Sequence, residues 1–175
     1  QLIPFLKATN CEFVDIVKDK GIKFNPLLSI SLDENQQIFS IKAFVDTIAA
    51  FVPSVGLAQK NILTNLVSEL FNRKHGVYPT ITELFQLLEE YYLENNKRQD
   101  TLYAGIQDLT TNIFNCDASN PPITDKSLYL NLPPALSDTL RQLVVFLLLR
   151  YFNTYFSSVN DCDPVDHVFP LRYVI

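Results

Sequence analysis

Hydrophobic side chains recur every three or four residues along most of the chain, which is the spacing of one face of an α-helix. The pattern predicts four amphipathic helices in succession, before a change of pattern near residue 120. The first helix starts at residues 31–34 and ends near Pro53, and the second covers 56–71. The third runs from Thr80 past Tyr91, and the fourth covers 100–114.

Two of these helices carry a start signal in which a Ser or Thr is followed three residues later by Glu. Ser31 with Glu34 opens the first helix, and Thr80 with Glu83 opens the third and is the clearer signal. Gly105 lies inside the fourth helix, where glycine costs about 1 kcal/mol relative to alanine.

Extended segments are predicted on both sides of the four helices. Residues 12–17 alternate as a short strand that ends at Asp19-Lys20-Gly21, and Asn25 should be extended or in a turn because Pro26 follows it. Residues 127–132 read as a second strand before Pro133-Pro134. A third hydrophobic strand begins at residues 171–175.

A long helix is predicted between the last two strands, at about residues 135–156. Its middle, residues 143–149, is apolar all round, so we expect other elements to cover it on most sides, as for a central helix. Strand, helix, loop and strand in this order are typical of a crossover in a parallel sheet. The predicted fold class is mainly α with a few parallel strands (α/β).

Composition favours one well-packed domain, since 47% of the 175 residues are hydrophobic. Methionine is absent, including at position 1, so we expect a fragment of a longer gene product. The longest apolar run, Leu143 to Leu149, is far shorter than the roughly 20 residues of a membrane span, so no membrane partner is expected. Three cysteines and no signal-peptide pattern favour a cytoplasmic location.

The formal charge of −5 argues against this chain being the main binder of nucleic acid. Basic residues gather only at 73–75 and 97–98. We interpret both groups as solvated helix ends, with phosphate contact as the alternative.

The sequence predicts no catalytic, cofactor-binding or metal-binding residue. Four glycines, at positions 21, 56, 76 and 105, are too few and too scattered for a phosphate-binding loop. His75 and His167 lie far apart and form no zinc motif. Residues 161–167, which are rich in Asp with one Cys and one His, are interpreted as an exposed loop, with a divalent-ion site as the alternative.

Other reactive or aromatic residues receive structural interpretations. Cys11 and Cys116 have no adjacent base and are expected to be buried thiols. The Tyr91-Tyr92 and Tyr151-Phe152 pairs are expected to pack in the core instead of stacking on bases. We interpret the acidic residue Glu83 as a helix cap, and Glu89, Glu90 and Glu94 as part of a solvated helix face. Paired catalytic carboxylates are the alternative.

Three segments in this order resemble the region between the Walker A and Walker B motifs of the HerA/FtsK-type motor ATPases, including their bacterial secretion and conjugation relatives. The first is Gly-Ile-Lys-Phe-Asn-Pro-Leu at 21–27. The second is the helical stretch 37–114 with its Tyr-Pro-Thr-Ile-Thr-Glu-Leu segment at 78–84. The third is the strand at 127–133, the apolar helix and the final segment 171–175.

The resemblance implies part of a RecA-like sheet carrying an all-helical insertion. Residues 1–30 would hold a strand and loop of the core sheet, 31–118 the insertion, and 119–175 a strand, a buried helix and the start of the Walker B strand. The family's nucleotide motifs fall outside these limits, so ATP and magnesium are expected for the parent and no cofactor for this fragment.

For the parent protein, the resemblance implies a ring-forming, nucleic-acid-dependent translocase or helicase. Lys and Arg residues on loops would then contact DNA or a neighbouring subunit. The alternative, from a different class, is a non-enzymatic helical interaction or regulatory domain.

Overall fold

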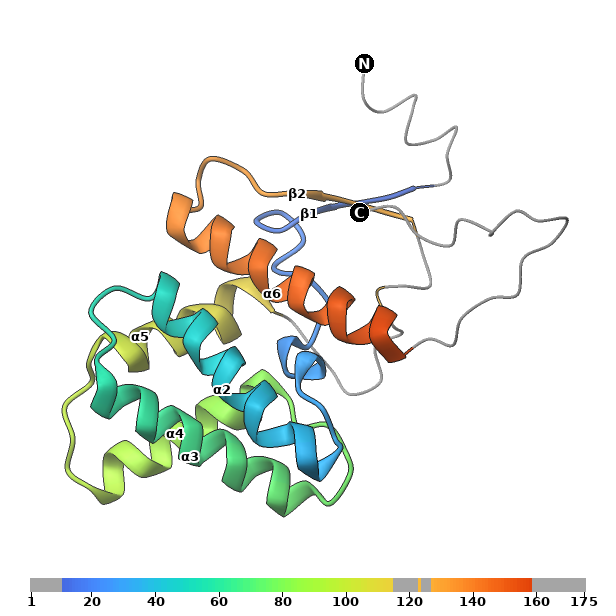
Figure 1. Cartoon of the computed structure of the whole chain (residues 1–175). Coiled ribbons are helices and arrows are strands. Elements are labelled where there is room, and N and C mark those ends of the chain that lie inside the picture. The colour runs from blue at the N-terminus through green and yellow to red at the C-terminus, as the bar shows by residue number, and fades with distance from the viewer. Residues whose placement is uncertain (1–10, 115–122, 124–126, 159–175) are drawn as a thin grey trace, which may run out of the picture.

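The computed structural model describes residues 11–114, 123 and 127–158, and 64% of these residues are helical (Figure 1). This confirms the mainly helical class with a small parallel sheet. In chain order the elements are β1 (Glu12–Asp15), the 3-10 turn η1 (Pro26–Ser29), α2 (Glu34–Phe51), α3 (Leu57–Lys74), α4 (Ile81–Glu94), α5 (Thr101–Asp108), the π-helical segment η2 (Leu109–Ile113), β2 (Leu128–Asn131) and α6 (Asp138–Ser158).

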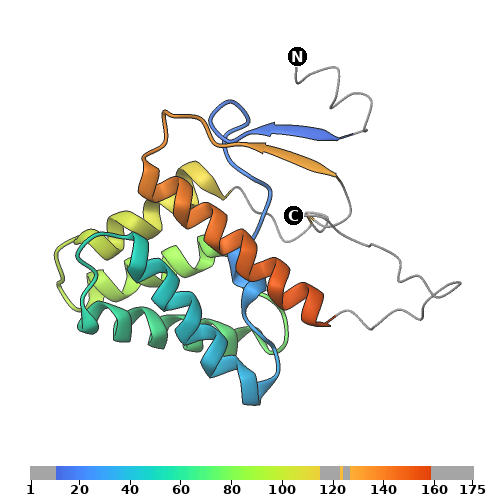
Figure 2. The same ribbon diagram turned by 45° about the horizontal axis from the view of Figure 1, so that its top comes forward.

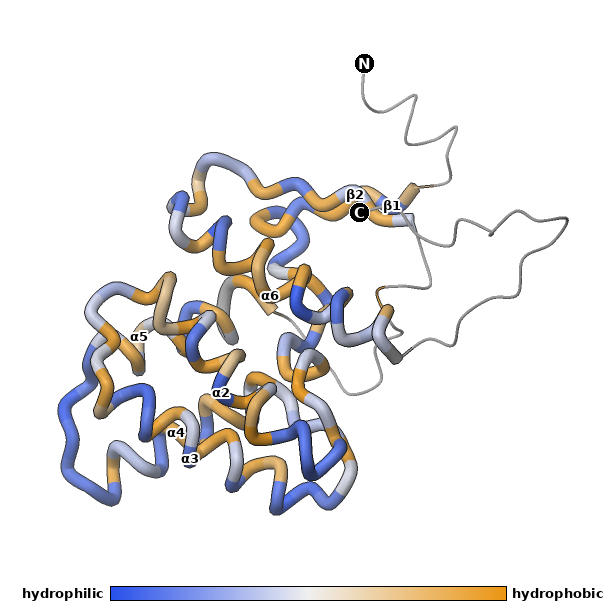
Figure 3. The backbone as a smooth tube through the Cα atoms, in the orientation of Figure 1, coloured by the Kyte–Doolittle hydropathy of each residue, from blue (hydrophilic) through white to orange (hydrophobic). Residues whose placement is uncertain are grey.

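The four central helices pack in chain order, α2 against α3, α3 against α4 and α4 against α5 (Figure 2). Helix α6 lies across η1 and α2, between this helical array and the strands. The connection from α4 to α5 lies at the outside of the array and is strongly hydrophilic (Figure 3). The periodicity of the sequence therefore identified each of the helices α2 to α5.

Helix starts agree with the sequence at Thr80 but not at Ser31. Thr80 Oγ1 accepts a hydrogen bond from the Glu83 amide at 3.2 Å, while the Glu83 carboxylate accepts one from the Thr80 amide at 2.8 Å. The first helix is instead capped by Asp33, whose carboxylate accepts from the Asn35 amide at 2.8 Å. The prediction for Ser31 was wrong because Asp33, two residues nearer the helix, reaches a free amide of the first turn.

Gly105 allows α5 to approach α2 closely. A Cβ atom at this position would lie 2.8 Å from both methyl carbons of Val52, which follows α2. Cβ atoms do not come so near another carbon, so a side chain at position 105 would not fit without a shift of Val52. The close packing that glycine allows offsets its low helix propensity. The predicted helix over 100–114 continues past α5 as the π-helical segment η2.

The strands β1 and β2 are hydrogen-bonded parallel neighbours, with Glu12 opposite Leu128 and Asp15 opposite Asn131. Both strands were predicted from the sequence. The helical array is thus inserted between two adjacent strands of one sheet. Its two ends also meet, because the Ile22 amide donates to the Ile113 carbonyl at 2.7 Å. The third predicted strand, 171–175, lies outside the described residues.

Helix α6 begins three residues later than predicted, at Asp138. After the two prolines the chain first makes a turn, in which the Leu136 amide donates to the Pro133 carbonyl at 3.0 Å. Ser137 then places its hydroxyl 3.2 Å from the Leu140 amide, so that it caps the helix.

One side of α6 is buried and the other is open. Core positions on the buried side are Leu143, Val144, Leu147, Leu148 and Tyr151. Val145, Phe146 and Leu149 retain 40%, 49% and 41% of their surface exposed. The expectation that α6 is covered on most sides is therefore wrong within the described residues. An apolar sequence around the whole helix did not distinguish the packed face from the open one.

One continuous hydrophobic core joins the helical array to α6 and to the segment after β1. Fully buried side chains come from each part, including Ile16, Phe44, Leu84, Ile106 and Leu147. The three units predicted from the sequence therefore share a single core. Among the described helices, none combines the length and apolar character needed to cross a membrane.

Candidate functional site at the carboxyl ends of the strands

Both strands end on a polar residue, and the two residues are paired. Asn131 Nδ2 donates a hydrogen bond to Asp15 Oδ2 at 2.9 Å. In open parallel sheets, ligands bind beyond the carboxyl ends of the strands. The Asp15–Asn131 pair marks this edge of the sheet, and we define it as the candidate site.

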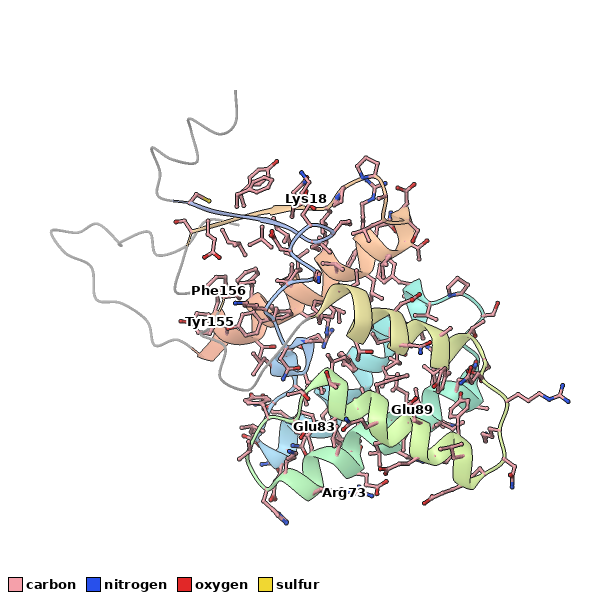
Figure 4. The ribbon with its side chains drawn as sticks, turned by 180° about the vertical axis from the view of Figure 1, so that it is seen from behind. Lys18, Arg73, Glu83, Glu89, Tyr155 and Phe156 are labelled. Carbon is pink, nitrogen blue, oxygen red and sulfur yellow. The ribbon has the colours of Figure 1, made fainter. Side chains whose placement is uncertain are left out.

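The turn after β1 surrounds the Asp15 carboxylate with donors. Asp15 Oδ1 accepts from the amides of Val17 at 3.1 Å and Lys18 at 3.2 Å. The Asp19 carboxylate closes the same turn by accepting from the Asp15 amide at 2.8 Å. Lys18 Nζ lies 3.9 Å from Asp15 Oδ2 and is otherwise exposed; Figure 4 shows Lys18 above this turn.

These contacts determine the ionisation of Asp15, of which only 5% is exposed. The hydrogen bond from Asn131, followed by that from the Lys18 amide, holds the pKa of the Asp15 carboxyl below its ordinary value. The carboxylate is therefore ionised at neutral pH, and both of its oxygens are engaged. Its chemistry is that of a fixed acceptor that orders the strand ends, and not of a proton donor.

A second ionic cluster joins the end of α3 to the start of α4. The Lys74 ammonium pairs with the Glu83 carboxylate, which also closes the Thr80 cap. Partial burial opposes ionisation of Glu83, but the hydrogen bonds from Lys74 and Thr80 hold its pKa below the ordinary value. Asn25 Nδ2 donates to the Pro79 carbonyl at 2.7 Å, so the turn at Asn25 is fixed to the same corner.

Asp100 forms a third cluster, at the start of α5. Its carboxylate accepts from the Tyr92 hydroxyl and from Gln59 Nε2, each at 2.7 Å, and from the Leu102 and Tyr103 amides. Burial disfavours the Asp100 charge, but these hydrogen bonds lower its pKa. Burial, and then the hydrogen bond to Asp100, raise the pKa of Tyr92. The cluster joins α3, α4 and α5, which is a structural role.

The acidic and basic groups noted in the sequence are largely taken up by such contacts. Glu89 accepts from the Tyr103 hydroxyl at 2.8 Å, and Glu83 closes the Thr80 cap. Arg73 pairs with Glu69 on α3. Lys97 Nζ lies 5.4 Å from the centre of the Tyr91 ring. The interpretation as helix ends and solvated faces fits these contacts.

Tyr92 and Tyr151 are buried, as expected for core aromatics, and Tyr91 and Phe152 pack against the core. Cys11 is only partly buried, so the expected buried thiol is not found at this position. His75 ends α3 in a left-handed conformation. The cluster 161–167, His167, Cys116 and Cys162 lie outside the described residues.

No group of three or more His, Cys, Asp or Glu side chains suited to a metal ion occurs within the described residues. Asp15 and Asn131 were both missed as site residues from the sequence. The predicted strands extended to residues 17 and 132, so no signal in the sequence marked Asp15 and Asn131 as the strand ends.

Comparison of the chain with protein-family models and with curated proteins gives no match.

Proposed function

We propose that this chain forms the helical insertion and adjoining sheet strands of a HerA/FtsK-like motor ATPase, a nucleic-acid-dependent translocase or helicase. One observation carries the proposal. The strands β1 and β2 are parallel neighbours in register, while α2 to α5 and η2 intervene between them in sequence. This arrangement of a helical insertion between adjacent core strands is the one that the sequence resemblance implies.

The surface of the sheet also supports a larger α/β domain. Phe13 and Tyr129 lie opposite each other on β1 and β2, with ring centroids 5.5 Å apart, and both are partly exposed. Sheets of parallel strands are normally covered on both faces. Further elements of the parent protein would cover this aromatic pair and extend the sheet.

In this proposal the parent binds ATP and magnesium through motifs outside the present limits, at the edge of the sheet marked by Asp15 and Asn131. Phosphoryl transfer requires a phosphate-binding loop and an acidic residue on the metal. The parent would act in the cytoplasm as a homo-oligomeric ring on DNA. The present chain would position its strands and hold the insertion against the core.

A second candidate is a non-enzymatic helical interaction domain. The open side of α6, with Val145, Phe146 and Leu149, favours it, because exposed apolar side chains on one helix face are typical of a surface that binds another protein.

Two measurements test the motor against the interaction domain. The full-length gene product should hydrolyse ATP, and duplex DNA should raise the rate. The 175-residue chain alone should give no heat of specific binding in calorimetric titration with Mg-ATP. Absence of ATP hydrolysis in the full-length protein would favour the interaction domain. Micromolar affinity of the 175-residue chain for Mg-ATP would contradict the proposal that the nucleotide motifs lie before Gln1 and after Ile175.

The reading frame of the parent gene provides an independent test. We expect Gly-Lys-Ser/Thr upstream of Gln1, and one to four further apolar residues followed by Asp-Glu or Glu-Glu downstream of Ile175. A polar loop with no acidic pair after Ile175 would count against the motor.

A further inference from the structure

A hollow of about 540 Å³ lies where η1, the start of α2 and the end of α6 meet. Its volume is within the range of small-molecule sites, roughly 300 to 1,000 Å³. The described residues that line it are Ser29, Ser31, Gln36, Phe39, Ser40, Asn153, Thr154 and Ser157.

Most hydroxyl groups around the hollow use their protons within the protein. Each donates to a main-chain carbonyl, which leaves oxygen lone pairs as acceptors on the wall. The donor and acceptor pairs are Ser29 with Pro26, Ser40 with Gln37, Thr154 with Ser29, and Ser157 with Asn153. Ser40 Oγ also accepts from the Ser31 amide at 3.0 Å. The lone pairs that remain on these oxygens can accept hydrogen bonds from O–H or N–H groups of a ligand.

Two side-chain amides complete the polar lining from opposite helices. Gln36 on α2 and Asn153 on α6 make no side-chain hydrogen bond within the described residues, so each offers donors and an acceptor. None of the described residues that line the hollow is charged. Among these described residues a phosphate or carboxylate would find no cation, and a metal ion would find no carboxylate.

Phe39 provides the apolar part of the site. Its side chain is 70% exposed although it lines the hollow. An open aromatic ring next to hydroxyl and amide groups matches a ligand that has both a ring face and several polar hydrogens.

We propose that this hollow binds an uncharged, hydroxyl-rich ring compound, namely a sugar, either free or as the sugar of a nucleoside. Phe39 would pack against the ring of the ligand. Gln36 and Asn153 would bind its hydroxyl groups from two sides, and the serine and threonine oxygens would accept its remaining protons. The inference goes beyond the motor assignment and does not depend on it.

The test is an NMR titration of the ¹⁵N-labelled 175-residue chain with methyl β-glucoside and, separately, with adenosine. At concentrations on the order of 1 to 10 mM, at least one probe should produce saturable shifts of the Phe39, Ser40, Asn153 and Thr154 amides. A response to both indicates recognition of the sugar alone, whereas a response to adenosine only indicates a nucleoside.

Phe39→Ala should weaken the binding roughly tenfold, because ring stacking is lost. Asn153→Ala should also weaken it. Leu93→Ala is the matched control, since Leu93 is a similarly exposed apolar residue on α4 that does not line the hollow. Far-ultraviolet circular dichroism should show that all three variants remain folded. The proposal is overturned by the absence of saturable shifts with both probes, or by binding that Phe39→Ala leaves unchanged.

Discussion

Asn131 and Asp15, 116 positions apart in sequence, are joined by a 2.9 Å hydrogen bond that ties the carboxyl ends of β2 and β1 together. Asn131→Ala leaves the buried carboxylate with only its partners in the turn after β1. We expect a lower urea midpoint of unfolding and faster exchange of the Ile16 amide, which donates to the Asn131 carbonyl. Asn72→Ala, at an exposed position on α3, should change neither quantity.

The pH dependence of stability should reveal the same carboxylate. Because the pKa of Asp15 is lower in the folded chain than its ordinary value, ionised Asp15 stabilises the fold above that ordinary value. This contribution is lost as the pH falls through the pKa of the folded state. The difference in urea midpoint between wild type and Asp15→Asn should therefore be full at neutral pH and shrink in acid below about pH 4. A difference that stays constant down to acid pH would contradict this assignment.

Gly105→Ala should destabilise the protein although alanine is the better helix former. The new methyl group would overlap Val52, and overpacking of this kind costs about 1 to 3 kcal/mol. Chemical denaturation of the single variants and of the double variant Gly105→Ala with Val52→Ala measures the coupling. We expect the double variant to be more stable than the sum of the single effects predicts. Strict additivity would show that the two residues do not clash.

The two sides of α6 should respond differently to the same substitution. Leu147→Ala removes a fully buried side chain and should lower the free energy of unfolding by about 2 to 5 kcal/mol. Leu149→Ala, two residues further on the open side, should change it by no more than about 0.5 kcal/mol. Equal losses for the two variants would mean that the open side is covered in solution.

Asp100 combines a helix cap with a link between three helices. Asp100→Ala should lower the free energy of unfolding by about 1 to 2 kcal/mol, because the amides of Leu102 and Tyr103 lose their acceptor. Asp100→Ser retains the cap but not the hydrogen bonds from Tyr92 and Gln59. The decrease in its free energy of unfolding therefore measures the contribution of these inter-helix bonds. Equal stability of the serine variant and wild type would show that the inter-helix bonds contribute nothing.

Local patterns predicted the helices because each one carries its own apolar stripe, and Thr80 with Glu83 fixed one start within a single turn. Contacts between distant segments were not predictable in this way. Nothing near Gly105 in sequence points to Val52, and nothing near Asp15 points to Asn131. The start of α2 at Asp33 depended on which of two neighbouring oxygens reaches the first-turn amides, which is a matter of geometry.

The pairing of β1 with β2 has a consequence for the order of folding. Helices α2 to α5 meet mainly their chain neighbours, whereas the two strands must find each other across the whole array. Closing so long a loop before any strand contact forms is entropically unfavourable, so contacts of low sequence separation should form first. The helical array then brings Ile22 and Phe114 together, which shortens the effective loop that the strands have to close. On this basis we expect the array to be the folding nucleus and the parallel ladder to assemble after the transition state, so substitutions in β1 and β2 should act mainly on the unfolding rate.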